Sequence, residues 1–197
     1  MAGKGRFVIG IAGNAGSGKS ELAQVFKDLG AGVISADRIG WEVLKQESVK
    51  ERLVKKFGQS IIDARGEVSR RCLGRLVFCN PLLRRYLDRV VHPEMLARIK
   101  QRIRSCPRRV VILDAALLFD WKIEKWFDWT ILVAAPQSVK QGRLVKNGLP
   151  RELARRLLHG QMKDRVARRK ADIVVRNTGS LGELKVQGRK LWRGIVR

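Results

Sequence analysis

The sequence predicts an α/β protein built on a parallel β-sheet that carries a phosphate-binding loop. Three observations support this fold class. Short apolar segments rich in Val and Ile, typical of buried parallel strands, alternate with segments of helical periodicity. The first apolar segment runs directly into a glycine-rich loop that opens a helix. Strand, helix and strand in succession then imply a right-handed parallel crossover.

The first crossover is predicted in residues 7–35. Residues 7–12 form a short apolar strand, and apolar side chains at helical spacing over residues 20–29 predict a helix that Gly30 ends. Residues 32–35 form a second strand. The chain then runs into Asp37, which is therefore expected at the carboxyl edge of the sheet.

The middle of the chain has a different character. Residues 38–107 show no strand signal and predict successive helices, with turns near Gly58, Gly66 and residues 80–81. We interpret this segment as a helical insertion into the α/β core.

Strands resume after the insertion, at residues 110–113, 130–133 and 172–175, all of them apolar and mostly β-branched. A C-terminal helix follows residues 177–179. The sequence therefore predicts that the core is completed by the second half of the chain.

Two helices are predicted between the last two strands. Pro136 opens the first, and residues 147–148 end it. The second is predicted as one continuous, very basic helix from Pro150 to about Arg169.

Composition limits the class of protein. The chain has 197 residues, 45% of them hydrophobic, which suits one α/β unit with an elaboration and excludes a disordered basic tail. The longest apolar run, residues 110–119, contains Asp114 and is shorter than the roughly 20 residues that span a bilayer. No membrane insertion is expected.

The three cysteines, Cys72, Cys79 and Cys106, are odd in number and match no zinc spacing, so we expect reduced thiols. The N-terminal residues lack the pattern of an export signal. Both observations favour a cytoplasmic protein.

The positive charge is large and unevenly distributed. The chain has 42 Lys and Arg against 18 Asp and Glu, a formal net charge of +24. Residues 65–109 have a net charge of +10 and residues 140–197 of +13, whereas residues 1–64 have only +3. The basic segments are expected to meet a polyanionic substrate.

The strongest motif is a phosphate-binding loop that fits G-x-x-x-x-G-K-[ST] and lies between a predicted strand and a predicted helix. Its glycines let the backbone N–H groups face inward, and the helix N-terminus adds partial positive charge. The motif predicts binding of ATP phosphates, with Lys19 as a mobile cation and Ser20 as a ligand of Mg²⁺. The expected ATP-binding residues of the loop are Gly13, Asn14, Ala15, Gly16, Ser17, Gly18, Lys19 and Ser20.

Two carboxylates are expected near this loop. Asp114 ends an apolar strand, as the Mg²⁺-binding Asp of phosphate-loop proteins does, although such strands also end in Asp for other reasons. Asp37 is placed to orient a hydroxyl acceptor or take its proton, and it could equally cap the helix that begins near Arg38. Position alone leaves both alternatives open.

The chain resembles the dephospho-coenzyme A kinase family, which phosphorylates the ribose 3′-hydroxyl of dephospho-CoA with ATP. The resemblance begins in the phosphate loop and residues 28–37, and it continues along nearly the whole chain. Its further matches, in the family's order and spacing, are Phe57-Gly58, Gly66, Arg70, Leu73, Val77-Phe78, His92-Pro93, Leu117-Leu118-Phe119-Asp120, Gln161, Ala171-Asp172 and Asn177-Thr178-Gly179.

The resemblance implies a P-loop NTPase core with a five-stranded parallel sheet flanked by helices, in residues 1–37, 108–136 and 171–197. It implies a helical CoA-binding insertion in residues 38–107 and a helical lid in residues 137–170. The catalytic residues would be Asp37 as base, Lys19 and Arg143. Substrate would be bound by Asp37, Arg70, His92 and Leu118, and Mg²⁺ by Ser20 and Asp114. Asn177 would join the loop in binding ATP.

The lid departs from the family pattern. The family has two arginines four residues apart, and here the first corresponds to Arg143 only if one residue is deleted, while the second becomes Lys146. Because Lys cannot form the planar clamp of Arg on phosphate, the lid would close less effectively or use Arg151 or Arg165. His92, before a proline, also has a purely structural alternative.

Two other functions stay open at this point. One is a P-loop kinase for another small hydroxyl acceptor, such as a nucleoside or nucleotide. The other is an ATPase that acts on nucleic acid, suggested by the charge and five tryptophans, although no nucleic-acid-binding module is visible. A monomer or small homo-oligomer is expected.

Overall fold

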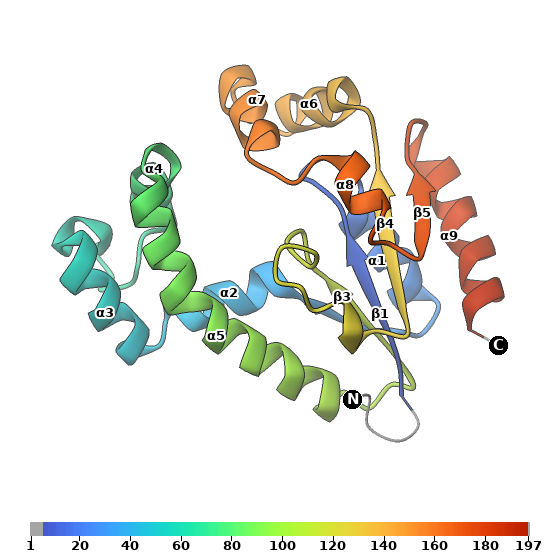
Figure 1. Ribbon diagram of the computed structural model, residues 1–197, viewed down its shortest axis with the longest axis horizontal. Coiled ribbons are helices and arrows are strands. Elements are labelled where there is room, and N and C mark those ends of the chain that lie inside the picture. Colours follow the sequence, from blue (N-terminus) through green and yellow to red (C-terminus); the bar gives the residue numbers. More distant parts are fainter. Residues whose placement is uncertain (1–5, 197) are drawn as a thin grey trace. The chain divides into compact units, whose positions relative to one another are not determined.

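The computed structural model describes residues 6–196, except for the side chains of residues 78 and 79, and places them in two compact units (Figure 1). The first unit contains the described residues up to Ser35 and from Ile103 onward, and the second is Ala36–Arg102. Cys72 and Cys106 are free thiols. The Cys79 thiol, and the N-terminal residues 1–5, lie outside the described part of the chain.

The first unit is built on a five-stranded parallel sheet in the order β2-β3-β1-β4-β5, which confirms the predicted fold class. The strands are β1 (Phe7–Ala12), β2 (Gly32–Ser35), β3 (Val110–Asp114), β4 (Trp129–Ala134) and β5 (Ile173–Arg176). All five agree with the predicted strands to within one residue at each end. They are rich in Val and Ile because β1, β3 and β4 are buried almost throughout.

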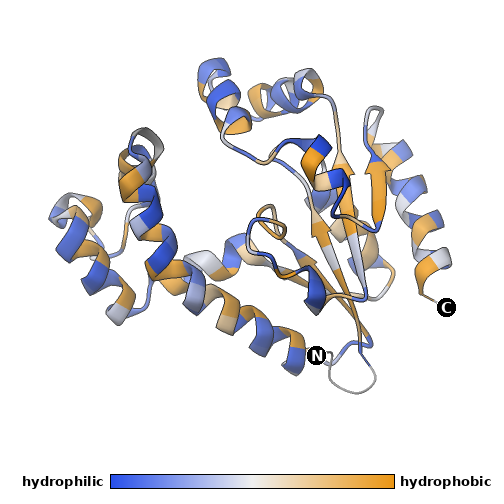
Figure 2. Ribbon diagram, in the orientation of Figure 1, coloured by the Kyte–Doolittle hydropathy of each residue, from blue (hydrophilic) through white to orange (hydrophobic). Residues whose placement is uncertain are grey.

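Helices α1 (Lys19–Asp28) and α9 (Leu181–Ile195) pack against one another and bury apolar side chains with the strands. The core there includes Phe26, whose ring lies 5.4 Å from that of Trp192 between centroids. Figure 2 shows the strands as largely apolar and α9 as striped, with polar and apolar residues alternating along the helix. Such striping is what a helix packed on one side of a sheet requires.

The chain between β4 and β5 forms α6 (Gln137–Lys146), α7 (Arg151–His159) and α8 (Asp164–Arg168). The prediction of one continuous helix from Pro150 to about Arg169 is therefore wrong. α7 ends at His159, and residues 160–163 are not helical. These residues form hydrogen bonds to a distant loop, described below, which a continuous helix would not provide.

The second unit is helical, as predicted for the insertion, with Gly58, Gly66 and residue 80 at the breaks. Its elements are α2 (Ala36–Leu44), α3 (Glu47–Phe57), the short 3₁₀ helix η1 (Gln59–Ile61), α4 (Arg70–Cys79) and α5 (Pro81–Ser105), the last of which extends into the first unit. Buried Val43, Leu53, Ile61, Leu73 and Ile99 belong to its core. Its one departure from an all-helical pattern in the described residues is an isolated antiparallel bridge between Ile62 and Val68.

Candidate active site

The glycine-rich loop joins β1 to α1, as the motif requires. Gly16 and Gly18 have φ angles of +74° and +95°, which L-residues with a side chain rarely adopt. A Cβ atom at Gly16 would lie 2.6 Å from the carbonyl oxygen of Lys140, and one at Gly18 would overlap the amide nitrogen of Asn177. Both glycines are therefore needed for backbone conformation and for space.

Three predicted residues meet at the carboxyl edge of the sheet. Ser20 Oγ donates a hydrogen bond of 2.7 Å to Asp114 Oδ2, and Lys19 Nζ lies 2.8 Å from Asp114 Oδ1. Lys19 and Asp114 are both more than nine-tenths buried. A buried cation and a buried carboxylate are stable only when they are paired, so this contact holds the Lys19 side chain at the loop.

The Ser20 and Asp114 oxygens suit Mg²⁺, which prefers oxygen ligands. The described residues hold no group of three or more His, Cys, Asp or Glu that could bind a metal ion. One carboxylate and one hydroxyl match an ion that takes its other ligands from substrate phosphates and water.

Asp37 is the second residue of α2, in its first turn, and is exposed. The helix begins at Ala36, so Asp37 lies within it and is not the residue that precedes it. Its carboxylate suits the positive end of the helix dipole. Two residues earlier in the chain, Ser35 is in register with Asp114 across β2 and β3.

Arg143, expected to be a lid residue that touches phosphate, instead holds the backbone of the loop in this structure. Its guanidinium donates to the carbonyl oxygens of Gly16 (3.3 Å), Ser17 (3.4 Å) and Gly179 (3.1 Å) and to Asn177 Oδ1 (3.2 Å). Asn177, which is 4% exposed, donates in turn to Ser17 O at 2.7 Å. Contacts of Arg143 and Asn177 with ATP stay predictions.

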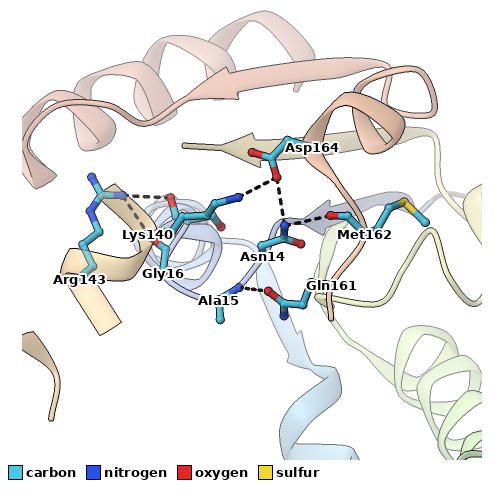
Figure 3. Close-up of polar contacts among 9 residues, drawn as sticks. Asn14, Ala15, Gly16, Lys140, Arg143, Gln161, Met162 and Asp164 are labelled. Atoms are coloured by element: carbon cyan, nitrogen blue, oxygen red, sulfur yellow. Dashed lines mark hydrogen bonds and ion pairs between the residues drawn. The ribbon is translucent and has the colours of Figure 1, made fainter. Parts of the chain in front are cut away.

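A second set of contacts joins the loop to residues 161–164 (Figure 3). Asn14 Nδ2 donates to the carbonyl oxygen of Met162 (3.0 Å) and to Asp164 Oδ1 (3.1 Å). The Ala15 N–H donates to Gln161 Oε1 at 3.1 Å. These partners lie about 150 residues apart in the chain, a separation that local patterns in the sequence do not reveal.

Lys140 completes this set of contacts. Its Nζ lies 2.9 Å from Asp164 Oδ1, and its side chain is only 7% exposed. No local pattern in the sequence predicts a role for Lys140 or Asp164. The available signals were Gly160, which interrupts the basic segment, and the carboxylate of Asp164 that follows it.

A cavity of about 480 Å³ opens beside these residues within the first unit. Asn14, Gln161 and Asp164 lie in its wall. Four basic side chains, Lys140, Lys163, Arg168 and Arg176, also line it. The 137–170 segment therefore borders a space whose charged lining residues are mostly cationic.

In the second unit, Arg70 opens α4 and stacks on the ring of Trp41, with 3.5 Å between the guanidinium carbon and the ring centroid. Both residues line a cavity of about 460 Å³ together with Asp63 and Glu67. Stacking of Arg on Trp restricts the guanidinium while leaving its edge free to bind an anion. The stacking therefore holds Arg70 in place, and its role in substrate binding stays a prediction.

The other two expected substrate residues have structural contacts. His92 Nε2 lies 3.4 Å from Asp88 Oδ1, one turn earlier in α5. Leu118 is fully buried and close to Gly10 of β1, so its side chain serves packing. Any substrate contact of Leu118 would fall to its backbone and stays a prediction.

The parallel sheet, the loop between β1 and α1, and the Lys19, Ser20 and Asp114 cluster together define a P-loop nucleotide-binding protein. The family model for dephospho-CoA kinase (CoaE) matches residues 7–183. The chain therefore belongs to the dephospho-CoA kinase family.

Individual relatives agree with this assignment. A dephospho-CoA kinase of Bacillus licheniformis is 35% identical over 96% of this chain and 98% of its own length. The crystal structure of TT1252 from Thermus thermophilus is 32% identical, with a TM-score of 0.82 over 98% of this chain and 100% of that one. A dephospho-CoA kinase from Campylobacter jejuni shares the fold at 21% identity, with a TM-score of 0.66 over 96% and 97% of the two chains.

Proposed function

We propose that this protein transfers the γ-phosphoryl group of ATP to the ribose 3′-hydroxyl of dephospho-CoA, which yields CoA and ADP in the last step of coenzyme A biosynthesis. The observation that carries the proposal is the family match over residues 7–183, combined with a complete phosphate loop at the carboxyl edge of the sheet. The match extends through both compact units.

Lys19 is the residue that would contact the β- and γ-phosphate oxygens. Its ammonium is already at the loop, paired with Asp114. Phosphate oxygens would either replace the Asp114 carboxylate as the partner of Lys19 or bind Lys19 together with it. A Lys side chain allows this because it is flexible and its ammonium charge needs no fixed direction. In phosphoryl transfer the main tasks of the protein are positioning and neutralisation of charge, and the loop N–H groups and Lys19 provide both.

Ser20 and Asp114 are the residues that would hold Mg²⁺. When bound, the ion would neutralise charge on the β- and γ-phosphate oxygens. The hydrogen bond between Ser20 Oγ and Asp114 Oδ2 supports this assignment, because the two oxygens lie 2.7 Å apart.

Asp37 is proposed to orient the acceptor hydroxyl and accept its proton. A carboxylate can do this only if it is accessible, and Asp37 is exposed at the start of α2. The second unit, with 16 Lys and Arg against 8 Asp and Glu, would attract the phosphate groups of the acceptor. Within the second unit, Arg70 is the best-defined candidate for contact with these phosphate groups, because it is stacked on Trp41.

The test is ADP production by the purified protein with ATP, Mg²⁺ and one acceptor at a time: dephospho-CoA, nucleosides, nucleotides or RNA. Stimulation by dephospho-CoA alone, with phosphate recovered at the 3′ position of the ribose, is the expected result. Stimulation by a nucleoside or nucleotide but not by dephospho-CoA would favour a kinase of different specificity. Stimulation only by RNA would contradict the proposal.

The described helices include none with the length and apolarity needed to cross a membrane. A cytoplasmic location follows from the proposed biosynthetic role. Two of the five tryptophans have packing partners: Trp192 lies against Phe26 in the first unit and Trp41 against Arg70 in the second. A monomer or small homo-oligomer stays a prediction.

A further inference from the structure

The segment between α7 and α8 crosses to the phosphate loop and is held there at several points. Asn14 binds both Met162 O and Asp164 Oδ1, and Lys140 pairs with the same carboxylate oxygen. The Lys140 side chain is nearly buried, so this pair is shielded from water and stronger than a surface ion pair. Gln161 is therefore held in place by the contacts of Met162 and Asp164 as well as by its own hydrogen bond with Ala15.

The amide of Gln161 has a defined orientation. Its partner is the N–H of Ala15, which can only donate, so the atom 3.1 Å away must be the amide oxygen. Because the amide group is planar, its NH₂ points away from the oxygen that accepts from Ala15. Figure 3 shows the oxygen facing Ala15 and the nitrogen turned away from that contact. Among the described residues, Nε2 has no hydrogen-bond partner, which leaves two donors at the edge of the loop.

The two N–H groups of Gln161 Nε2 are expected to lie near the phosphates of bound ATP. Ala15 directly precedes Gly16 in the loop whose backbone N–H groups and Lys19 receive the β- and γ-phosphates in this motif. The α1 N-terminus surrounds the phosphate that lies deepest in such a loop. The γ-phosphate projects furthest from the loop. A side chain that comes from outside the loop and contacts Ala15 is therefore expected to lie near the γ-phosphate.

We propose that Gln161 is a further ATP-binding residue, anchored through Oε1 to Ala15 and donating through Nε2 to the γ-phosphoryl group. The role of Gln161 rests on one part of the proposed function, which is that ATP is the phosphoryl donor. The side chains of Asn14, Lys140 and Asp164 are then positioning groups, because their contacts hold the segment that carries Gln161 against the loop.

The decisive variant is Gln161→Glu. A glutamate keeps an oxygen that accepts from Ala15, so the anchor is retained, but it replaces the NH₂ by a negatively charged oxygen. Repulsion of the γ-phosphate should weaken ATP binding by about tenfold or more, equivalent to about 1.4 kcal/mol, while ADP binding changes by less than about threefold. Binding is measured by titration calorimetry with Mg²⁺ and without any acceptor.

Gln141→Glu is the matched control, since it makes the same charge change in α6, where the Gln141 amide nitrogen binds only Arg151 O in the described structure. It should bind both nucleotides as the wild type does. If Gln161→Glu binds ATP normally, the amide only caps Ala15 and the proposal is wrong. Equal weakening of ATP and ADP would also overturn it, because that result indicates a distorted loop.

Gln161→Ala keeps the test decisive if the glutamate variant unfolds, as judged by thermal denaturation. It removes both the anchor and the donors, and we expect a loss of about three- to tenfold for ATP with little change for ADP. An unchanged ratio of ATP to ADP affinity would count against the proposal. Because no arm contains dephospho-CoA, the outcome does not depend on the identity of the acceptor.

Discussion

Ser20 Oγ donates a 2.7 Å hydrogen bond to Asp114 Oδ2, although the two residues are 94 positions apart in the chain. The contact exists because β1 and β3 are neighbours, with Ile11 in register with Asp114. Parallel neighbours end at the same edge of a sheet, so the helix that follows β1 begins beside the carboxylate that ends β3. The relationship places the two proposed metal ligands next to one another.

Lys19→Met should abolish most activity, since it removes the cation that the loop presents to the β- and γ-phosphates. Loss of one such electrostatic contact commonly costs about 10²- to 10³-fold in turnover. The measurement is steady-state ADP production together with ATP affinity. Lys27→Met, in the last turn of the same helix and exposed, should retain near-wild-type values. Comparable losses in the two variants would point to general destabilisation.

Asp37→Asn should lower the rate of transfer to dephospho-CoA by about 10²-fold or more while ATP affinity stays close to that of the wild type. The amide keeps the shape of the side chain but cannot accept the proton of the hydroxyl. Asp28→Asn makes the same charge change at the end of α1 and should have little effect on the rate. Near-normal transfer by Asp37→Asn would exclude Asp37 as the base.

Arg143→Lys should reduce stability, because an ammonium cannot reach the four acceptors that the guanidinium binds. At about 0.5–1.5 kcal/mol for each hydrogen bond, and with part of the site open to water, a loss of about 1–3 kcal/mol is expected. Thermal unfolding should show this as a melting temperature several degrees lower.

The exposed Arg169→Lys serves as the comparison for Arg143→Lys, and it should melt like the wild type. A variant Arg143→Lys with unchanged melting temperature but a much lower turnover number would show that Arg143 acts on phosphate and not on the loop backbone.

Two glycine substitutions should have opposite effects. Gly142→Ala lies on the exposed side of α6 with nothing near its added methyl group, and helix propensity predicts a gain of about 0.5–1 kcal/mol. Gly16→Ala should lose stability and ATP affinity, because its φ of +74° and the nearby Lys140 carbonyl leave no room for a Cβ atom. Thermal melting and ATP titration of both variants check the pair. A stable, ATP-binding Gly16→Ala would mean that the loop can adopt another backbone path.

The fold was largely predictable because its signals are local. A buried parallel strand is a short run of β-branched residues, and residues 7–12 and 110–114 are so apolar that no other assignment competes. Most of the candidate site followed from the same patterns, since a loop after β1 and a carboxylate after β3 must share one edge of the sheet. Side chains from α6 to α8 were much less predictable, because no local pattern shows which of many basic residues turns toward the loop.

By itself, the sequence determined the class of protein: the order of strands and helices, the phosphate loop from Gly13 to Ser20, and the resemblance that named the family. Tertiary structure alone decided how individual side chains are used. It buried Leu118, turned Arg143 to the loop backbone, broke the predicted helix at Gly160 and brought Gln161 to Ala15. These outcomes depend on hydrogen bonds and packing between residues distant in the chain, and such contacts exist only once the sheet has assembled.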